Sequence, residues 1–226
     1  MTHFSKFLQA CASRSAPERS FLGALQHWAA QRIVRELPVG LAVSDLSRIG
    51  LVGAGLTALA LVASNWVPGF AVLVPVGVAV NWFGAALDGP LASHRRQGGP
   101  KLNLNNHLTD FVSFLTIIVA YGFSPFFTLT AAATILACFL MFSAYHYLRA
   151  ASGHVGQVVL MGVGATEFRL LLAVWPFFAR ALGVGSVVEG PEEQLNVVIA
   201  GLAVVAIAAL IVKVVVDAQR IASARR

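Results

Sequence analysis

The sequence has little charge and almost no cysteine, which argues against several classes of protein. Charged residues make up 12% of the 226 residues, whereas soluble domains contain about a quarter. The two cysteines, Cys11 and Cys138, have no metal-ligand spacing, so we expect neither a disulfide nor a cysteine-bound metal. Basic residues do not alternate with aromatic residues, so the net charge of +6 does not indicate nucleic-acid binding. With a mean hydropathy of +0.77, the composition favours a polytopic membrane protein.

Apolar runs make up most of the chain. A helix needs about 20 apolar residues to cross the hydrocarbon layer. Six segments meet this length, and we predict transmembrane helices over 46–64, 68–90, 106–123, 126–148, 163–182 and 195–215. Glycines recur in the first two segments, where they fit small-residue contacts between helices: Gly50, Gly53, Gly55, Gly77 and Gly84. The predicted fold is therefore an all-α integral membrane protein.

The N-terminal region lacks the apolar core of a signal peptide, so the first span is expected to target the chain. Ser15, Pro17 and Glu18 predict a helix start, and apolar residues then recur at helical spacing from Phe21 to Leu37. We predict an amphipathic helix along the membrane surface; packing on a partner protein is the alternative. This gives a cytoplasmic segment, residues 1–40, followed by a six-span membrane domain, residues 41–226.

Basic residues are distributed asymmetrically between the two expected sides. Of 16 Lys and Arg residues, 14 flank the predicted spans on one side, Arg180 is on the other, and Arg169 is within the fifth span. Cytoplasmic loops are enriched in Lys and Arg. The pattern predicts a multi-pass protein of the cell inner (cytoplasmic) membrane, with both termini and the loop containing Arg95, Arg96 and Lys101 in the cytoplasm.

Polar residues gather beside this loop. Asp88 ends the second predicted span, and Asn106 and Asp110 lie four apart, on one face of the third. Carboxylates are costly in a bilayer and often mark functional sites. Oxygen ligands of this kind suit Mg²⁺, which also binds substrate phosphates. The alternative is that these residues solvate helix ends. Glu167 and Arg169, two apart on a helix, do not face each other, so each needs another partner: a phosphate or an interhelical polar contact for Arg169.

These residues carry a family resemblance. Asp88, Gly89, Ala92 and Asp110 match part of the pattern Asp-x-x-Asp-Gly-x-x-Ala-Arg followed, after seven to nine residues, by Gly-x-x-x-Asp-x-x-x-Asp. The segment thus resembles the signature of the CDP-alcohol phosphatidyltransferases. His107, the segment 43–47 and the stretch 164–169, which is similar to Gly-Pro-Thr-Glu-x-Arg, also resemble that family. From about Glu18 onward, the resemblance implies six spans, a surface helix and often a homodimer.

The signature is incomplete in this chain. Its first aspartate falls on Ala85, its arginine on Ser93, its second glycine on Leu102 or Asn103, and its third aspartate on Asn106. The neighbours that could compensate are Asn81, one turn before Ala85, and Arg95 or Arg96, near Ser93. Two metals close together repel each other and need surrounding negative charge. With two carboxylates instead of four, we expect at most one metal without substrate.

The resemblance implies a membrane phosphotransferase of phospholipid biosynthesis. It would move a phosphatidyl or related phospho-alcohol group from a CDP-linked donor to a small hydroxyl acceptor and release CMP. Asp110 would be the catalytic base, and Asp88, Asn106 and Asp110 would bind Mg²⁺ or Mn²⁺. The residues expected to bind substrate are Gly89, Ala92, Ser93, Arg95, Arg96, Asn81, His107, Glu167 and Arg169. The alternative is a catalytically impaired member that binds a lipid headgroup or nucleotide, or is a membrane subunit. A small transporter has only the number of spans in its favour.

Overall fold

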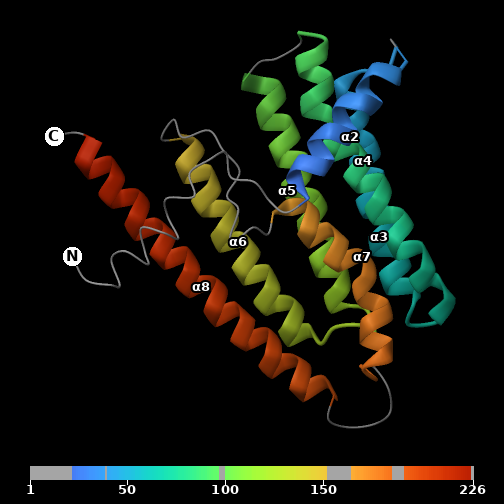
Figure 1. Ribbon diagram of the computed structural model, residues 1–226. Coiled ribbons are helices and arrows are strands. Elements are labelled where there is room, and N and C mark those ends of the chain that lie inside the picture. The colour runs from blue at the N-terminus through green and yellow to red at the C-terminus, as the bar shows by residue number, and fades with distance from the viewer. Residues whose placement is uncertain (1–21, 39, 97–99, 152–163, 185–190, 225–226) are drawn as a thin grey trace.

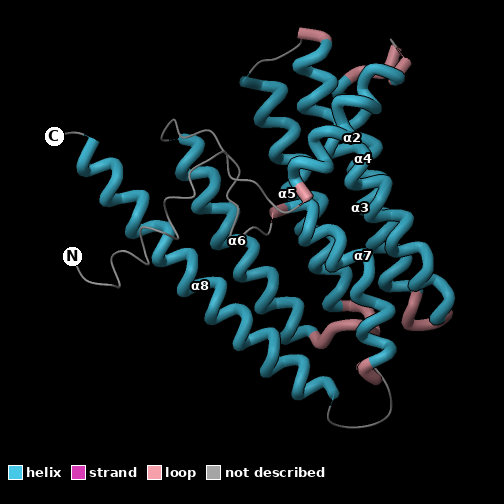
Figure 2. The backbone as a smooth tube through the Cα atoms, in the orientation of Figure 1, coloured by secondary structure: helices cyan, strands magenta, loops and turns pink. Residues whose placement is uncertain are grey.

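The chain folds into helices. The computed structural model describes residues 22–38, 40–96, 100–151, 164–184 and 191–224 (Figure 1). Within these ranges it contains no strand, and Figure 2 shows the described residues as helices with short loop segments. The helices are α2 (Gly23–Glu36), α3 (Val43–Ala63), the 3-10 helix η1 (Pro68–Val72), α4 (Leu73–His94), α5 (Pro100–Gly122), α6 (Leu129–Ala151), α7 (Ala165–Ala181) and α8 (Pro191–Ala224). The predicted all-α class is confirmed.

Four segments of the described chain are long and apolar enough to cross a membrane: Val43–Ala63, Pro68–His94, Leu129–Arg149 and Glu192–Gln219. They correspond to the first, second, fourth and sixth predicted spans. The third and fifth differ for two physical reasons. The apolar part of α5 is the shorter segment His107–Gly122, and α7 has 17 residues, with Glu167 and Arg169 in its first turns.

Successive helices run in alternating directions. In Figure 1, the end of α4, the start of α5 and the ends of α6 and α8 lie toward the upper side, whereas α7 ends toward the lower side. Arg95 and Arg96 directly follow α4, and Arg180 is in the last turn of α7. The basic loop and Arg180 therefore lie toward opposite ends of the bundle.

The closest helix pair is α3 with α4, and glycines permit their approach. A Cβ added at Gly53, Gly77 or Gly84 would lie closer than 3.0 Å to an atom of the facing helix. At Gly53 and Gly84 the obstructing atoms are backbone atoms, which cannot rotate away. Gly55 differs, because nothing lies within 4 Å of its added Cβ. The predicted small-residue contact thus depends on three of the five glycines.

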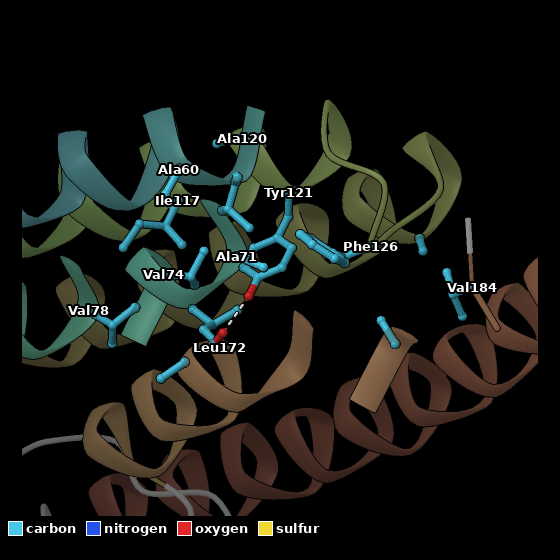
Figure 3. Close-up of a cluster of buried hydrophobic side chains, with 14 of the residues drawn as sticks. Ala60, Ala71, Val74, Val78, Ile117, Ala120, Tyr121, Phe126, Leu172 and Val184 are labelled. Carbon is cyan, nitrogen blue, oxygen red and sulfur yellow. Dashed lines mark hydrogen bonds between the residues drawn. The ribbon is translucent and has the colours of Figure 1, made fainter. Parts of the chain in front are cut away.

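The main core lies between α3, α4, α5 and α7. Leu61, Val74, Ile117 and Tyr121 are buried there together with Leu172. Figure 3 shows the Tyr121 hydroxyl donating a hydrogen bond to the Leu172 carbonyl, so this phenol group is satisfied inside an apolar cluster. The bond connects α5 to α7, three residues after Arg169 along α7.

Helix α2 has two apolar sides. Ala30 and Val34 are buried against Leu87 and Leu91 of α4. Leu25 and Trp28, part of the apolar face expected from the sequence, are each 61% exposed. Its predicted start at Ser15 lies outside the described residues. Helix α2 thus packs on the bundle and leaves a second apolar face open.

Large apolar side chains also cover the outside of α6 and α8. Exposed examples on α8 are Val197, Leu202, Val204, Val205 and Ile211. In water such a continuous surface would be unfavourable, whereas lipid chains are as apolar as these residues. These faces therefore contact membrane lipid.

Gly84→Ala should destabilise the bundle, because the new methyl group meets the backbone of α3. We expect a loss of about 1–3 kcal/mol, the usual cost of overpacking, as earlier unfolding of the purified protein in a thermal or detergent titration. Gly55→Ala is the matched control, for which we expect no loss. Equal unfolding of the two variants would contradict the close α3–α4 contact.

Candidate functional site

The site is organised around Arg169, whose position is fixed by the start of α7. Glu167 accepts hydrogen bonds from the backbone N–H of Gly164 (2.9 Å) and from that of Leu22 (2.6 Å). It therefore satisfies a free donor at the start of α7 and links this helix to the residue before α2. Thr166 and Gln26 form a second link between the two segments. Arg169, two residues after Glu167, points into the bundle and is 4% exposed.

Arg169 has three partners inside the protein. Its Nη2 donates to Asp110 Oδ1 at 2.8 Å, and its Nε donates to Asn81 Oδ1 at 3.0 Å. Its guanidinium carbon lies 4.6 Å from the centre of the Phe114 ring. A buried charge is costly unless it is paired and hydrogen-bonded. These contacts supply both conditions, so Arg169 makes the interhelical polar contact that was one of its two predicted roles.

Asn81 connects this pair to the closely packed helices. Its Nδ2 donates to the Gly50 carbonyl at 2.9 Å, and its side chain is buried. The amide therefore donates to α3 and accepts from α7 at the same time. With Asp110 on α5, the network joins four helices.

The structure brings Asp88 near the charged groups of Asp110 and Arg169. Asp88 is half-buried on α4, and both Asp110 and Arg169 act on its carboxylate electrostatically. The backbone N–H of Gly89 donates to Asp88 Oδ1. Asp110 remains 38% exposed in spite of its ion pair. The two predicted acidic residues thus belong to one cluster, to which Arg169 contributes positive charge.

Among the described residues, this cluster offers two carboxylates, Asp88 and Asp110, as candidate ligands for a divalent ion. Ala85 has no donor atom, and the side chain of Asn106 lies outside the described part of the structure. Among the described residues, no group of three or more His, Cys, Asp and Glu side chains can hold a metal. Asp88 and Asp110 alone match the way Mg²⁺ is held by one or two carboxylates, with waters and substrate phosphates completing its shell.

The basic loop is used partly for structure. Arg95 donates to the carbonyl oxygens of Pro38 (2.8 Å) and Leu41, which ties the end of α4 to the segment between α2 and α3. Arg96 is exposed and follows the end of α4 with a φ of 54°. The side chain of Lys101 lies outside the described residues. Of the two arginines near Ser93, only Arg96 has a side chain without a described partner.

The remaining predicted substrate residues lie in different surroundings. Ala92 is buried in the contact between α4 and α2, whereas Gly89 and Ser93 are exposed on α4. His107 is exposed on α5, and its ring centre lies 5.9 Å from that of His146 on α6. Tyr147 of α6 donates to the His107 carbonyl at 3.4 Å. An aromatic cluster therefore lies one turn from Asp110.

Some residues that contribute to the site were not predicted from the sequence. Phe114 is one turn after Asp110 at i+4, so its place on the same face could have been inferred. The Gly50 carbonyl offers no such signal, since any backbone could supply it. A second polar contact was also missed: Asp217 of α8 accepts from Tyr145 and lies 3.5 Å from Arg149 of α6. It joins the last two long helices.

Asp110→Ala should destabilise the protein, because it leaves the Arg169 guanidinium buried without its counter-ion. Breaking a buried pair from one side costs about 3–5 kcal/mol, and the partial exposure of Asp110 favours the lower end. Asp110→Asn keeps an oxygen acceptor and should lose less. Arg48→Ala breaks the exposed Asp45–Arg48 pair and should cost less than about 1 kcal/mol. Detergent-based unfolding curves measure all three, and equal losses for Asp110→Ala and Arg48→Ala would contradict the buried network.

Comparison with known protein families, with characterised proteins and with solved structures gives no match for this chain. The functional conclusion therefore depends on the side chains that α4, α5 and α7 bring together. These are two carboxylates, a buried guanidinium and an amide that orients it.

Proposed function

We propose that this protein is a membrane phosphotransferase that moves a phosphatidyl or related phospho-alcohol group from a CDP-linked donor to a hydroxyl acceptor. The observation that carries the proposal is the clustering of Asp88, Asp110 and Arg169 on helices with apolar outer faces. Ionisable groups are rare in such surroundings and usually serve substrates or ions. A guanidinium suits phosphate oxygens, and a half-exposed carboxylate suits a hydroxyl proton.

The proposed reaction uses these groups in complementary ways. The acceptor oxygen attacks the phosphorus that carries the lipid or alcohol group, the bond from this phosphorus to the CMP oxygen breaks, and CMP leaves. Asp110 accepts the hydroxyl proton. Arg169 and the exposed Arg96 stabilise charge on the phosphate oxygens. Mg²⁺ or Mn²⁺, when held by Asp88 and Asp110, would neutralise further charge on the pyrophosphate.

The membrane arrangement we propose has six crossings, with α5 and α7 completing the four long apolar helices. Arg169 and Asp110 neutralise each other within this pair of shorter helices, which lowers the cost of placing them in lipid. The open face of α2, with Leu25 and Trp28, would lie in the inner interface. The basic loop would lie on the cytoplasmic side, as in inner-membrane proteins, and a homodimer would be the working unit.

A second candidate is a protein that binds a nucleotide or lipid headgroup without turnover. The specific observation in its favour is the direct Arg169–Asp110 pair, which occupies the proposed base. Ala85, which contributes no carboxylate, points the same way. This candidate keeps the phosphate ligand and removes the chemical step.

CMP release distinguishes the two. The purified protein in nanodiscs is incubated with Mg²⁺, with CDP-diacylglycerol as donor, and with glycerol phosphate or inositol phosphate as acceptor. Under these conditions the wild type should release CMP. Asp110→Asn should reduce the rate by at least about 100-fold, as expected for loss of a catalytic base. Asp88→Asn should also reduce the rate, because it removes one of the two carboxylates that would hold Mg²⁺. Glu192→Gln, exposed at the start of α8, is the control and should keep the wild-type rate.

If the wild type and the variants bind cytidine nucleotide but release no CMP, the second candidate is favoured.

Ala85→Asp offers a further comparison, because it adds a carboxylate one turn before Asp88 on α4. If the site is a phosphotransferase site with too few acidic residues, this variant should release CMP faster than the wild type. Absence of both binding and turnover would remove the proposal.

A further inference from the structure

The pairing of Arg169 with Asp110 has a consequence for cation binding. Asp110 is one of two carboxylates available to a divalent ion, and its Oδ1 already accepts from the Arg169 guanidinium at 2.8 Å. Asp88 is also under the influence of this guanidinium. A divalent ion and Arg169 would therefore compete for the Asp110 carboxylate, and their positive charges would repel each other at short range.

We propose that Arg169 is a built-in counter-ion that competes with a divalent cation for Asp110, and that a phosphate ligand relieves this competition. The proposal rests on the proposed function insofar as the ligand carries phosphate. Without ligand, the guanidinium holds Asp110 and the site binds the cation weakly. A phosphate group that engages Arg169 withdraws it from Asp110, so cation and ligand bind cooperatively.

Arg169 has the donors needed for this exchange. A guanidinium carries five N–H groups, and the contacts found among the described residues use one at Nε and one at Nη2. Its remaining donors are available to a second acceptor. Asp110, 38% exposed, gives a ligand access to the pair from the surface. The Asn81 contact anchors the Nε edge while the Nη groups change partner.

The fixed position of Arg169 also makes the competition persistent. The side chain is 4% exposed and rests against the Phe114 ring, so it cannot turn into water when a cation approaches. An exposed arginine such as Arg48, with a side chain that is 79% exposed, would move aside and be screened. The expected effect is therefore specific to Arg169 and does not follow from net charge alone.

Binding of Mn²⁺ to the purified full chain tests this inference without any catalytic readout. Electron paramagnetic resonance of free Mn²⁺ gives its affinity with and without CDP, and a protein-free titration corrects for Mn²⁺ bound by CDP in solution. Wild-type protein should bind Mn²⁺ about tenfold more tightly at saturating CDP, within the usual range of coupling between sites. By reciprocity, Mn²⁺ should tighten CDP binding by the same factor.

Two variants report on Arg169 itself. Arg169→Met should bind Mn²⁺ about tenfold more tightly than wild type in the absence of CDP, and CDP should add little. Arg169→Lys keeps the charge but lacks the planar fork that spans Asn81 and Asp110, so it should lie between the two. It also keeps the test possible if Arg169→Met does not fold. Arg48→Met removes the same charge from the surface and should bind Mn²⁺ as wild type does.

Wild-type Mn²⁺ affinity that is unchanged by CDP and equal to that of both Arg169 variants would overturn the inference. That result leaves the CMP-release experiment unaffected, so the proposed transfer could still stand. Conversely, cooperative binding without CMP release would retain the counter-ion role and remove the transfer. Equal tightening in Arg169→Met and Arg48→Met would reduce the effect to net charge and also overturn it.

Discussion

The structure depends on neutralising one buried guanidinium. Arg169 lies on a short helix among apolar neighbours, where an unpaired charge would cost several kcal/mol. Its partners come from α4 and α5, 88 and 59 residues away in sequence. The need to satisfy Arg169 therefore constrains the relative positions of three helices. The acidic residues that we propose as metal ligands also serve as its counter-charge.

Close helix packing supports the same network. Gly53 and Gly84 let α3 and α4 approach until their backbones nearly touch, and Asn81 then lies near enough to donate to the Gly50 carbonyl. This bond holds the amide so that its oxygen faces Arg169. A larger residue at the contact would shift α4 and, with it, the acceptor of Arg169. Packing and site geometry are in this way determined by the same pair of helices.

The sequence predicts a good part of this arrangement. Apolar length identified four of the long helices, because helix rise and bilayer thickness fix that length. Helical periodicity also showed that Glu167 and Arg169 face different neighbours, as their separate contacts with Gly164 and Asp110 confirm. Periodicity acts within one helix, however. It cannot choose among distant partners. The pairing of Arg169 with Asp110 and the hydrogen bond from Arg95 to the Pro38 carbonyl therefore become visible only in the folded structure.

Arg169 also sets the charge balance of the cluster. Four clustered carboxylates would repel one another strongly in a medium of low dielectric constant and would need metal ions to coexist. Here Ala85 contributes no charge, and the Arg169 guanidinium offsets the charge of Asp110. A partly buried cluster with two acidic residues can thus be held together by one arginine.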